Sequence, residues 1–224
     1  MTFVTVDHLV VAAPSLDAGV AWCERTLGVT PGPSGQHPQM GTHNRLLKIA
    51  SDAYPQAYLE IIAIDPAAPH PGRVRWFGLD ELDLSDAAGG PRLVHWVGRS
   101  PMLDMHRWGL VTVGQAPGDP LAASRDTPAG TLRWQILVRA DGRLHAAGAL
   151  PTLIQWQGPH PADAMPDSGV VLKSLTINRV PPRSRDVLRL RGVSAVDDDG
   201  APLRAVLATP TGDITLSSTP VPSP

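Results

Sequence analysis

The chain has 224 residues, of which 42% are hydrophobic and 18% charged, and its formal net charge at pH 7 is −2. A fold of this size buries roughly 70% of its unfolded surface, so disulfides are not needed for stability. The near-neutral charge predicts no binding to nucleic acid and no electrostatic attachment to a membrane. The sequence has neither a leader pattern nor a run of 18 apolar residues, so we expect a cytoplasmic protein.

A repeat around a histidine is the most informative feature of the sequence. The stretch from His8 reads HLVVAAPSLD, and the stretch from His95 reads HWVGRSPMLD. In both copies an apolar strand pattern runs through the histidine, a Pro/Ser break follows, and Leu-Asp opens a helix pattern. Internal repeats of this kind indicate duplicated structural units, so we expect two related halves.

The first half has a βαβββ pattern. The predicted elements are a strand at 2–12, a helix at 16–27, a loop or irregular edge strand at 29–40, and strands at 42–49 and 57–64. Ser15 is a suitable N-cap for the helix, and Gly28 is suited to end it. In the first strand the two-residue period places Val4, Val6 and His8 on one face.

The second half repeats this pattern with a longer insertion. The predicted elements are a strand at 93–99, a short helix at 102–110, a weak strand at 111–115, an insertion at 116–130, and strands at 132–138 and 150–157. We therefore assign a first module to residues 1–66, a connector to 67–91 and a second module to 92–165. Because loops set specificity, the insertion is expected to influence substrate choice.

The C-terminal part reads as a third, degenerate copy of the unit. The predicted elements are a strand at 170–178, a helix at 184–190 and a hairpin of strands at 203–208 and 213–217. We interpret residues 166–218 as an accessory βαββ unit that adds no ligand, since its first strand carries no histidine and its last no acid. Residues 219–224 read as a disordered tail.

Ligand-type residues occur on the first and last strands of both halves. If the two halves face one another, His8, Glu60, His95 and Gln155 would meet in one cleft. Two imidazoles, a carboxylate and an amide suit Fe, Mn, Ni, Co or Zn more than Ca or Mg. Glu60 lies on an otherwise apolar strand, where an ionised carboxylate needs a metal or another cation; without a metal it is a candidate general base. The alternatives are a metal-free cleft that binds an organic ligand, and a purely structural duplication.

Four further side chains are weaker candidates for substrate binding. His43 lies on a strand next to Glu60, where a surface turn is an equal alternative. Arg45, Arg133 and Gln135 would hold an anionic or carbonyl substrate if they projected into the cleft, although arginines in strands more often point outward. Trp156 flanks a ligand candidate and is expected on the opposite face, packed against a helix.

Five stretches of the chain resemble a known family. They read DHLVVA (7–12), GTHN (41–44), YLEIIAIDP (58–66), WFGL (76–79) and GALPTLIQW (148–156). Together they resemble bacterial glyoxalase-like domain proteins of the vicinal oxygen chelate superfamily, over about residues 3–175. The resemblance implies an α+β fold of paired βαβββ modules with a C-terminal extension, and a divalent metal at His8, Glu60, His95 and Gln155. The last position is usually glutamate, and a glutamine amide binds a metal but accepts no proton.

The resemblance also implies a function. It points to a divalent-metal-dependent lyase, isomerase or dioxygenase-type enzyme that acts on a small carbonyl or vicinal-oxygen substrate. The alternative is a binding protein that sequesters a small molecule in the same cleft without turnover. A third interpretation is a scaffold whose sheet edges form a homodimer.

Overall fold

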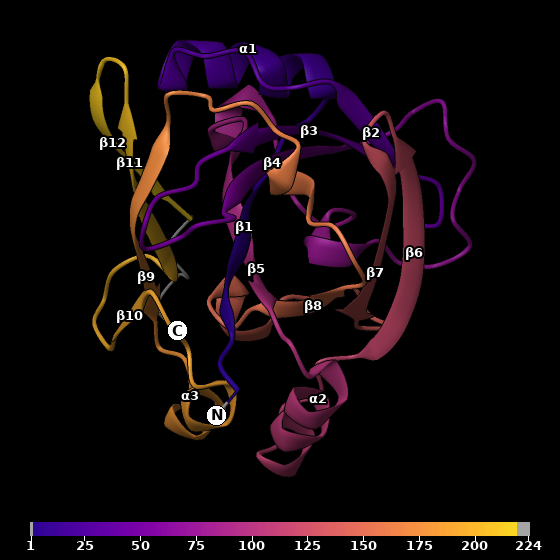
Figure 1. The fold of residues 1–224 in the computed structure, drawn as a ribbon, viewed down its shortest axis with the longest axis vertical. Coiled ribbons are helices and arrows are strands. Elements are labelled where there is room, and N and C mark those ends of the chain that lie inside the picture. The colour runs from indigo at the N-terminus through magenta and orange to yellow at the C-terminus, as the bar shows by residue number, and fades with distance from the viewer. Residues whose placement is uncertain (1, 219–224) are drawn as a thin grey trace.

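The computed structural model describes residues 2–218, and the predicted tail at 219–224 lies outside the described residues. The fold is α+β, with an eight-stranded sheet that curls around one face and a four-stranded sheet packed beside it (Figure 1). This is the predicted class of paired βαβββ modules with a C-terminal extension. No helix within residues 2–218 is long and apolar enough to span a membrane.

The two halves contain matching elements. The first half comprises β1 (Thr5–Ala12), α1 (Leu16–Leu27), β2 (Ser34–His37), β3 (Thr42–Lys48) and β4 (Tyr58–Ile64). The second comprises β5 (Arg92–Arg99), α2 (Leu103–Thr112), β6 (Asp119–Thr127), β7 (Gly130–Val138) and β8 (Thr152–Trp156). Both β5 and α2 begin 87 residues after β1 and α1 (92 minus 5, and 103 minus 16), which confirms the repeat. As predicted, Ser15 caps α1 and Gly28 ends it in a left-handed conformation.

The second strand of the second half differs from the prediction. Val111 and Thr112 end α2 and Val113 begins the following turn, instead of forming a strand. The strand is β6, which lies inside the predicted insertion and pairs along its whole length with β7. Its sequence, DPLAASRDT, is polar and largely exposed, so tertiary pairing decides its conformation more than intrinsic preference.

The two halves are arranged symmetrically about the centre of the eight-stranded sheet. The order is β2-β3-β4-β1-β5-β8-β7-β6, so β1 and β5 pair at the centre and each half extends outward from them. The sheet curls until its two ends approach, and the side-chain amide of Gln39 donates to the carbonyl of Ala122 across 3.4 Å. We call the enclosed face the inner face. The outer face packs against α1 and the four-stranded sheet.

Two β-bulges lie at the centre of the sheet. Asp7 has no partner between the pairs Val6–Gly98 and His8–Val97, and Val94 has none between His95–Val10 and Leu93–Val11. An extra residue in one strand shifts the alternation of its side chains. Val4 and Val6 therefore belong to the outer core, whereas His8 lies on the inner face. The prediction that these three side chains share a face is wrong, because the bulge intervenes.

The C-terminal unit covers the outer side. It comprises β9 (Val171–Asn178), α3 (Pro182–Leu188), β10 (Val193–Val196), β11 (Leu203–Thr209) and β12 (Gly212–Ser217). The short strand β10 was not predicted. The order β10-β9-β11-β12 places the first strand beside the second, whereas each half places the first strand beside the last. This order does not agree with a third copy of the repeat.

The connector folds over the inner face. The short 3-10 helices of the chain are Trp76–Gly78, Asp86–Ala88, His145–Gly148 and Pro161–Asp163. Trp76 and Phe77, from the first of them, pack in an apolar cluster with Val10, Trp134 and Ile154 of the inner face. The inner face is therefore a lined hollow and not an open sheet.

Candidate functional site

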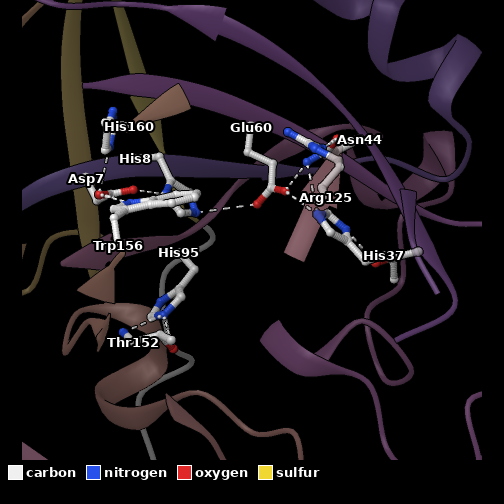
Figure 2. A network of polar contacts seen from close by, with 11 residues as sticks. Asp7, His8, His37, Asn44, Glu60, His95, Arg125, Thr152, Trp156 and His160 are labelled. Atoms are coloured by element: carbon white, nitrogen blue, oxygen red, sulfur yellow. Dashed lines mark hydrogen bonds and ion pairs between the residues drawn. The ribbon is translucent and has the colours of Figure 1, made fainter. Parts of the chain in front are cut away.

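Two of the predicted residues, His8 and Glu60, lie side by side on the inner face. They come from the adjacent parallel strands β1 and β4, where Val10 is the register partner of Glu60. His8 Nε2 and Glu60 Oε2 are 3.6 Å apart, and both side chains are almost fully buried (Figure 2). This separation is longer than a hydrogen bond, so both atoms remain available to a bound molecule.

Asp7 orients the imidazole of His8. Its fully buried carboxylate accepts hydrogen bonds from His8 Nδ1 at 2.7 Å, Trp156 Nε1 at 2.9 Å and His160 Nε2 at 3.1 Å. Burial alone would raise the pKa of Asp7, but the hydrogen bonds from the two histidines outweigh it and hold that pKa far below its usual range. Since the ionised carboxylate only accepts, His8 carries a proton on Nδ1 and directs Nε2 toward Glu60.

The other side of Glu60 is held by a polar network. Asn44 Nδ2 donates to Glu60 Oε1 at 2.6 Å and contacts His37 Nε2 at 3.3 Å, and Arg125 Nη1 donates to Asn44 Oδ1 at 3.3 Å. His37 Nδ1 lies 3.1 Å from Thr42 Oγ1. Burial lowers the pKa of His37 to about 4, so this imidazole is neutral at pH 7. Glu60 Oε1 is thus occupied, and Oε2 is the oxygen free to react.

Aromatic side chains enclose the pair. Tyr58 stacks on the imidazole of His8 with ring centroids 4.5 Å apart. Burial and the nearby carboxylates of Asp7 and Glu60 raise the pKa of Tyr58, so it remains a neutral phenol. The hollow in front of the pair has a volume of about 30 Å³, which is room for a reacting group or one to two water molecules. At Arg125 and Pro161 the hollow meets a groove of about 870 Å³.

His95 is buried on the same sheet but turns toward its own half. Its Nδ1 bonds to the carbonyl of Gly148 at 2.9 Å, and its Nε2 accepts from the backbone N–H and the hydroxyl of Thr152, each at 3.0 Å. Burial lowers the pKa of His95 to about 3. The neutral ring has no free lone pair for a metal, and Figure 2 shows it pointing away from Glu60.

Gln155 does not reach the inner face. Its Oε1 accepts from the backbone N–H of Leu103 at 3.1 Å, and its Nε2 donates to the carbonyl of Pro101 at 3.2 Å. This side chain therefore caps the N-terminus of α2 on the outer face. By strand alternation Ile154 and Trp156 line the hollow, so the predicted outward orientation of Trp156 is wrong.

The four predicted ligands thus do not meet at one point. Within residues 2–218, no three side chains of His, Cys, Asp and Glu are grouped so that they could hold a metal ion. His8 and Glu60 lie together, whereas the polar atoms of His95 and Gln155 are hydrogen-bonded to groups of their own half.

The structure places the four weaker candidates away from the hollow. In β3 the side chain of Asn44 faces Glu60, so His43 and Arg45 point to the outer face, where Arg45 donates to the carbonyl of Gly32 at 3.0 Å. In β7 the inner side chains are those of Trp134 and Ile136. Because side chains alternate along a strand, Arg133 and Gln135 point outward, and the inward projection considered for them is wrong.

The polar network of the site includes residues outside the predicted ligand set, among them Asp7, His37, Asn44, Arg125 and His160. A signal existed for Asp7, because Asp7 and His8 interrupt an otherwise apolar strand. His37 lies on the edge strand β2 and Asn44 on the neighbouring strand β3. Arg125 lies in the region predicted as an insertion, and His160 lies in a loop. The curl of the sheet brings these residues together.

The fold and the site define a class of protein in which two βαβββ modules share one sheet and a buried polar site lies on its inner face. Residues 6–189 match the family described as Glyoxalase-like domain, so the chain belongs to that family, and the resemblance to the vicinal oxygen chelate superfamily is confirmed. No curated protein matches the sequence.

Solved structures are similar to this chain at low sequence identity. A hypothetical protein from Staphylococcus aureus has a TM-score of 0.52 and 14% identity, over 95% of this chain and 84% of that chain. A methylmalonyl-CoA epimerase in complex with methylmalonyl-CoA and NH4+ has a TM-score of 0.42 and 16% identity, over 69% of this chain and 94% of that chain. The similarity to the Staphylococcus aureus protein concerns the fold alone.

Proposed function

We propose that this glyoxalase-like protein is a proton-transfer enzyme of the isomerase or lyase type, which acts on a small carbonyl compound bound on the inner face. The observation that carries the proposal is the pair His8 Nε2 and Glu60 Oε2, buried, unbonded and 3.6 Å apart. A buried acid–base pair at the end of a groove is an arrangement typical of such catalysis.

The two side chains have complementary tasks. Glu60 Oε2 takes the proton from the carbon next to the carbonyl, and the C–H electron pair forms the C=C bond of the enol. Protonated His8 donates from Nε2 to the carbonyl oxygen, whose π electrons become the new O–H bond. Return of a proton to carbon and loss of the enol proton complete an isomerisation, or a leaving group departs in a lyase reaction.

The surroundings support these roles. Asn44 fixes one oxygen of Glu60 and leaves the other free, and Asp7 fixes the orientation of the His8 imidazole. The aromatic lining and the small volume of the hollow keep bulk water from the enol intermediate.

The family implies a divalent metal, but the predicted ligand set does not fit the observed donors. Both ring nitrogens of His95 and both polar atoms of the Gln155 amide are occupied within the protein. We therefore assign no step to a metal, and the roles of His8 and Glu60 rest on their own chemistry.

Binding without turnover is the second candidate function. The groove, at about 870 Å³, is large enough for a drug-sized molecule, whereas the hollow at the reactive pair is far smaller. A sequestering protein would use the groove and leave His8 and Glu60 as lining.

Proton transfer is tested directly by hydrogen exchange. A panel of α-keto acids and 1,2-diones is incubated with the protein in D2O, and loss of the α-proton signal is followed by NMR. We expect Glu60→Gln and His8→Ala to slow exchange about 10²- to 10⁴-fold. The matched control is His95→Gln, at the equivalent position of the second half, which should retain most of the rate. Binding of panel members without any exchange would support sequestration instead.

A further inference from the structure

The groove beside the reactive pair contains a cation with little protein contact. Arg125, on β6, lines both the hollow and the groove. In residues 2–218 its guanidinium makes one hydrogen bond, to Asn44 Oδ1, and no ion pair. A guanidinium has five N–H donors, so most of them are free to bind a ligand.

The backbone makes room for this guanidinium. Gly35 lies opposite on β2, and a Cβ added there would overlap Arg125 Nη1 and come within 2.7 Å of Asn44 Oδ1. The edge strands β2 and β6 approach each other because the sheet curls. The missing side chain of Gly35 then leaves space for Arg125 of β6 to reach the site of the first half.

The rest of the groove is mostly apolar, and its charged side chains make hydrogen bonds or ion pairs. Apolar residues that line it include Pro33, Leu46, Leu132, Pro161 and Met165. Its acidic residues are held by donors: Asp126 by Thr131 at 2.6 Å, Asp163 by Gln56 at 2.7 Å and Asp167 by Lys48 at 2.8 Å. Arg125 thus presents the free positive charge at the inner end of an apolar groove.

We propose that the substrate carries a carboxylate, which binds Arg125, and an apolar body, which lies in the groove. The carbon next to its carbonyl would then lie at Glu60, and the carbonyl oxygen at His8. A planar carboxylate matches the fork of a guanidinium and forms paired, charge-assisted hydrogen bonds. Arg125 and Glu60 contact opposite ends of the same amide of Asn44, so one small molecule spans both. This inference rests on the proposed function and names its substrate class.

The test compares two probes with the same apolar body. Binding of 2-naphthoate and of the neutral 2-naphthamide is measured by titration calorimetry. Wild-type protein should bind the carboxylate at least about tenfold tighter. Arg125→Gln should lower naphthoate affinity about tenfold or more and change naphthamide affinity less than about twofold. Unchanged naphthamide binding also shows that the variant is folded.

Two further variants sharpen the test. Gly35→Ala leaves the charge in place but fills the space of the guanidinium, so naphthoate affinity should fall in the same direction. Arg133→Gln, on the outer face, is the matched control and should change neither affinity. Equal binding of the two probes by wild-type protein, or an equal loss of both in Arg125→Gln, would overturn the proposal.

The outcome separates this inference from the proposed function. Glu60→Gln should still prefer naphthoate to naphthamide even when proton exchange is lost. A normal rate of exchange on neutral diones together with no preference for the carboxylate would retain the acid–base pair and reject the role of Arg125.

Discussion

The two halves of the sheet share a backbone but differ in chemistry. With the offset of 87 residues, His8 corresponds to His95 and the bulged Asp7 to the bulged Val94. In the parallel pairing, Val10 opposes Glu60, and its counterpart Val97 opposes Thr152. Each half therefore has a histidine beside a last-strand residue, but both carboxylates occur in the first half.

This difference shows how one copy leaves a histidine nitrogen free while the other binds both nitrogens within the protein. His95 bonds to Thr152 and Gly148 and has no free nitrogen, whereas His8 bonds to Asp7 on one side and faces Glu60 across a gap. The register also shows that the counterpart of Glu60 is Thr152 and not Gln155. The repeat thus duplicates the imidazole, and the neighbouring charges decide what it can do.

The largest effect on stability is expected at Asp7. Asp7→Leu leaves the buried donors of His8, Trp156 and His160 without an acceptor, so we expect a loss of about 3–5 kcal/mol in the free energy of unfolding. At the equivalent position Val94→Ala removes only apolar contacts, and about 2 kcal/mol is expected. Urea unfolding of both variants measures the difference. Equal losses would mean that Asp7 does not act as the central acceptor.

Acid should destabilise the protein through its buried histidines. The pKa of His95 is lowered to about 3 and that of His37 to about 4, below the usual value of 6.5. Between pH 6.5 and these values the unfolded chain binds more protons, so stability falls as the pH is lowered through this window. His95→Gln should reduce that slope by about 1.4 kcal/mol per pH unit. Urea unfolding from pH 8 to pH 4 tests this; an identical slope in wild type and variant would contradict it.

The smallest effect compares the caps of the two equivalent helices. Helix α1 is capped locally by Ser15, whereas α2 is capped from across the chain by Gln155. Replacement of either residue by alanine should cost about 1 kcal/mol. Thermal unfolding measures the loss, and the exchange assay should show no change in rate for Gln155→Ala. A large loss of activity in that variant would contradict this and indicate that Gln155 acts at the reactive pair.

Local sequence determined much of the architecture. The repeat at His8 and His95, the caps Ser15 and Gly28, and the apolar periods predict paired βαβββ modules, because strand and helix periods are local properties. The sequence also placed His8 and Glu60 in one cleft, as two members of a set of four residues that the structure does not bring together.

Tertiary structure decided which side chains share the site. The bulge at Asp7 shifts the alternation of β1. Gln155 lies three residues beyond Thr152 (155 minus 152), the register counterpart of Glu60, and this odd offset turns its side chain outward. The curl of the sheet brings Arg125 from the edge strand β6 to Asn44. Each outcome depends on pairing between strands distant in the chain. A shift of one residue exchanges the two faces of a strand, so local patterns identify the strands but not the final set of inward side chains.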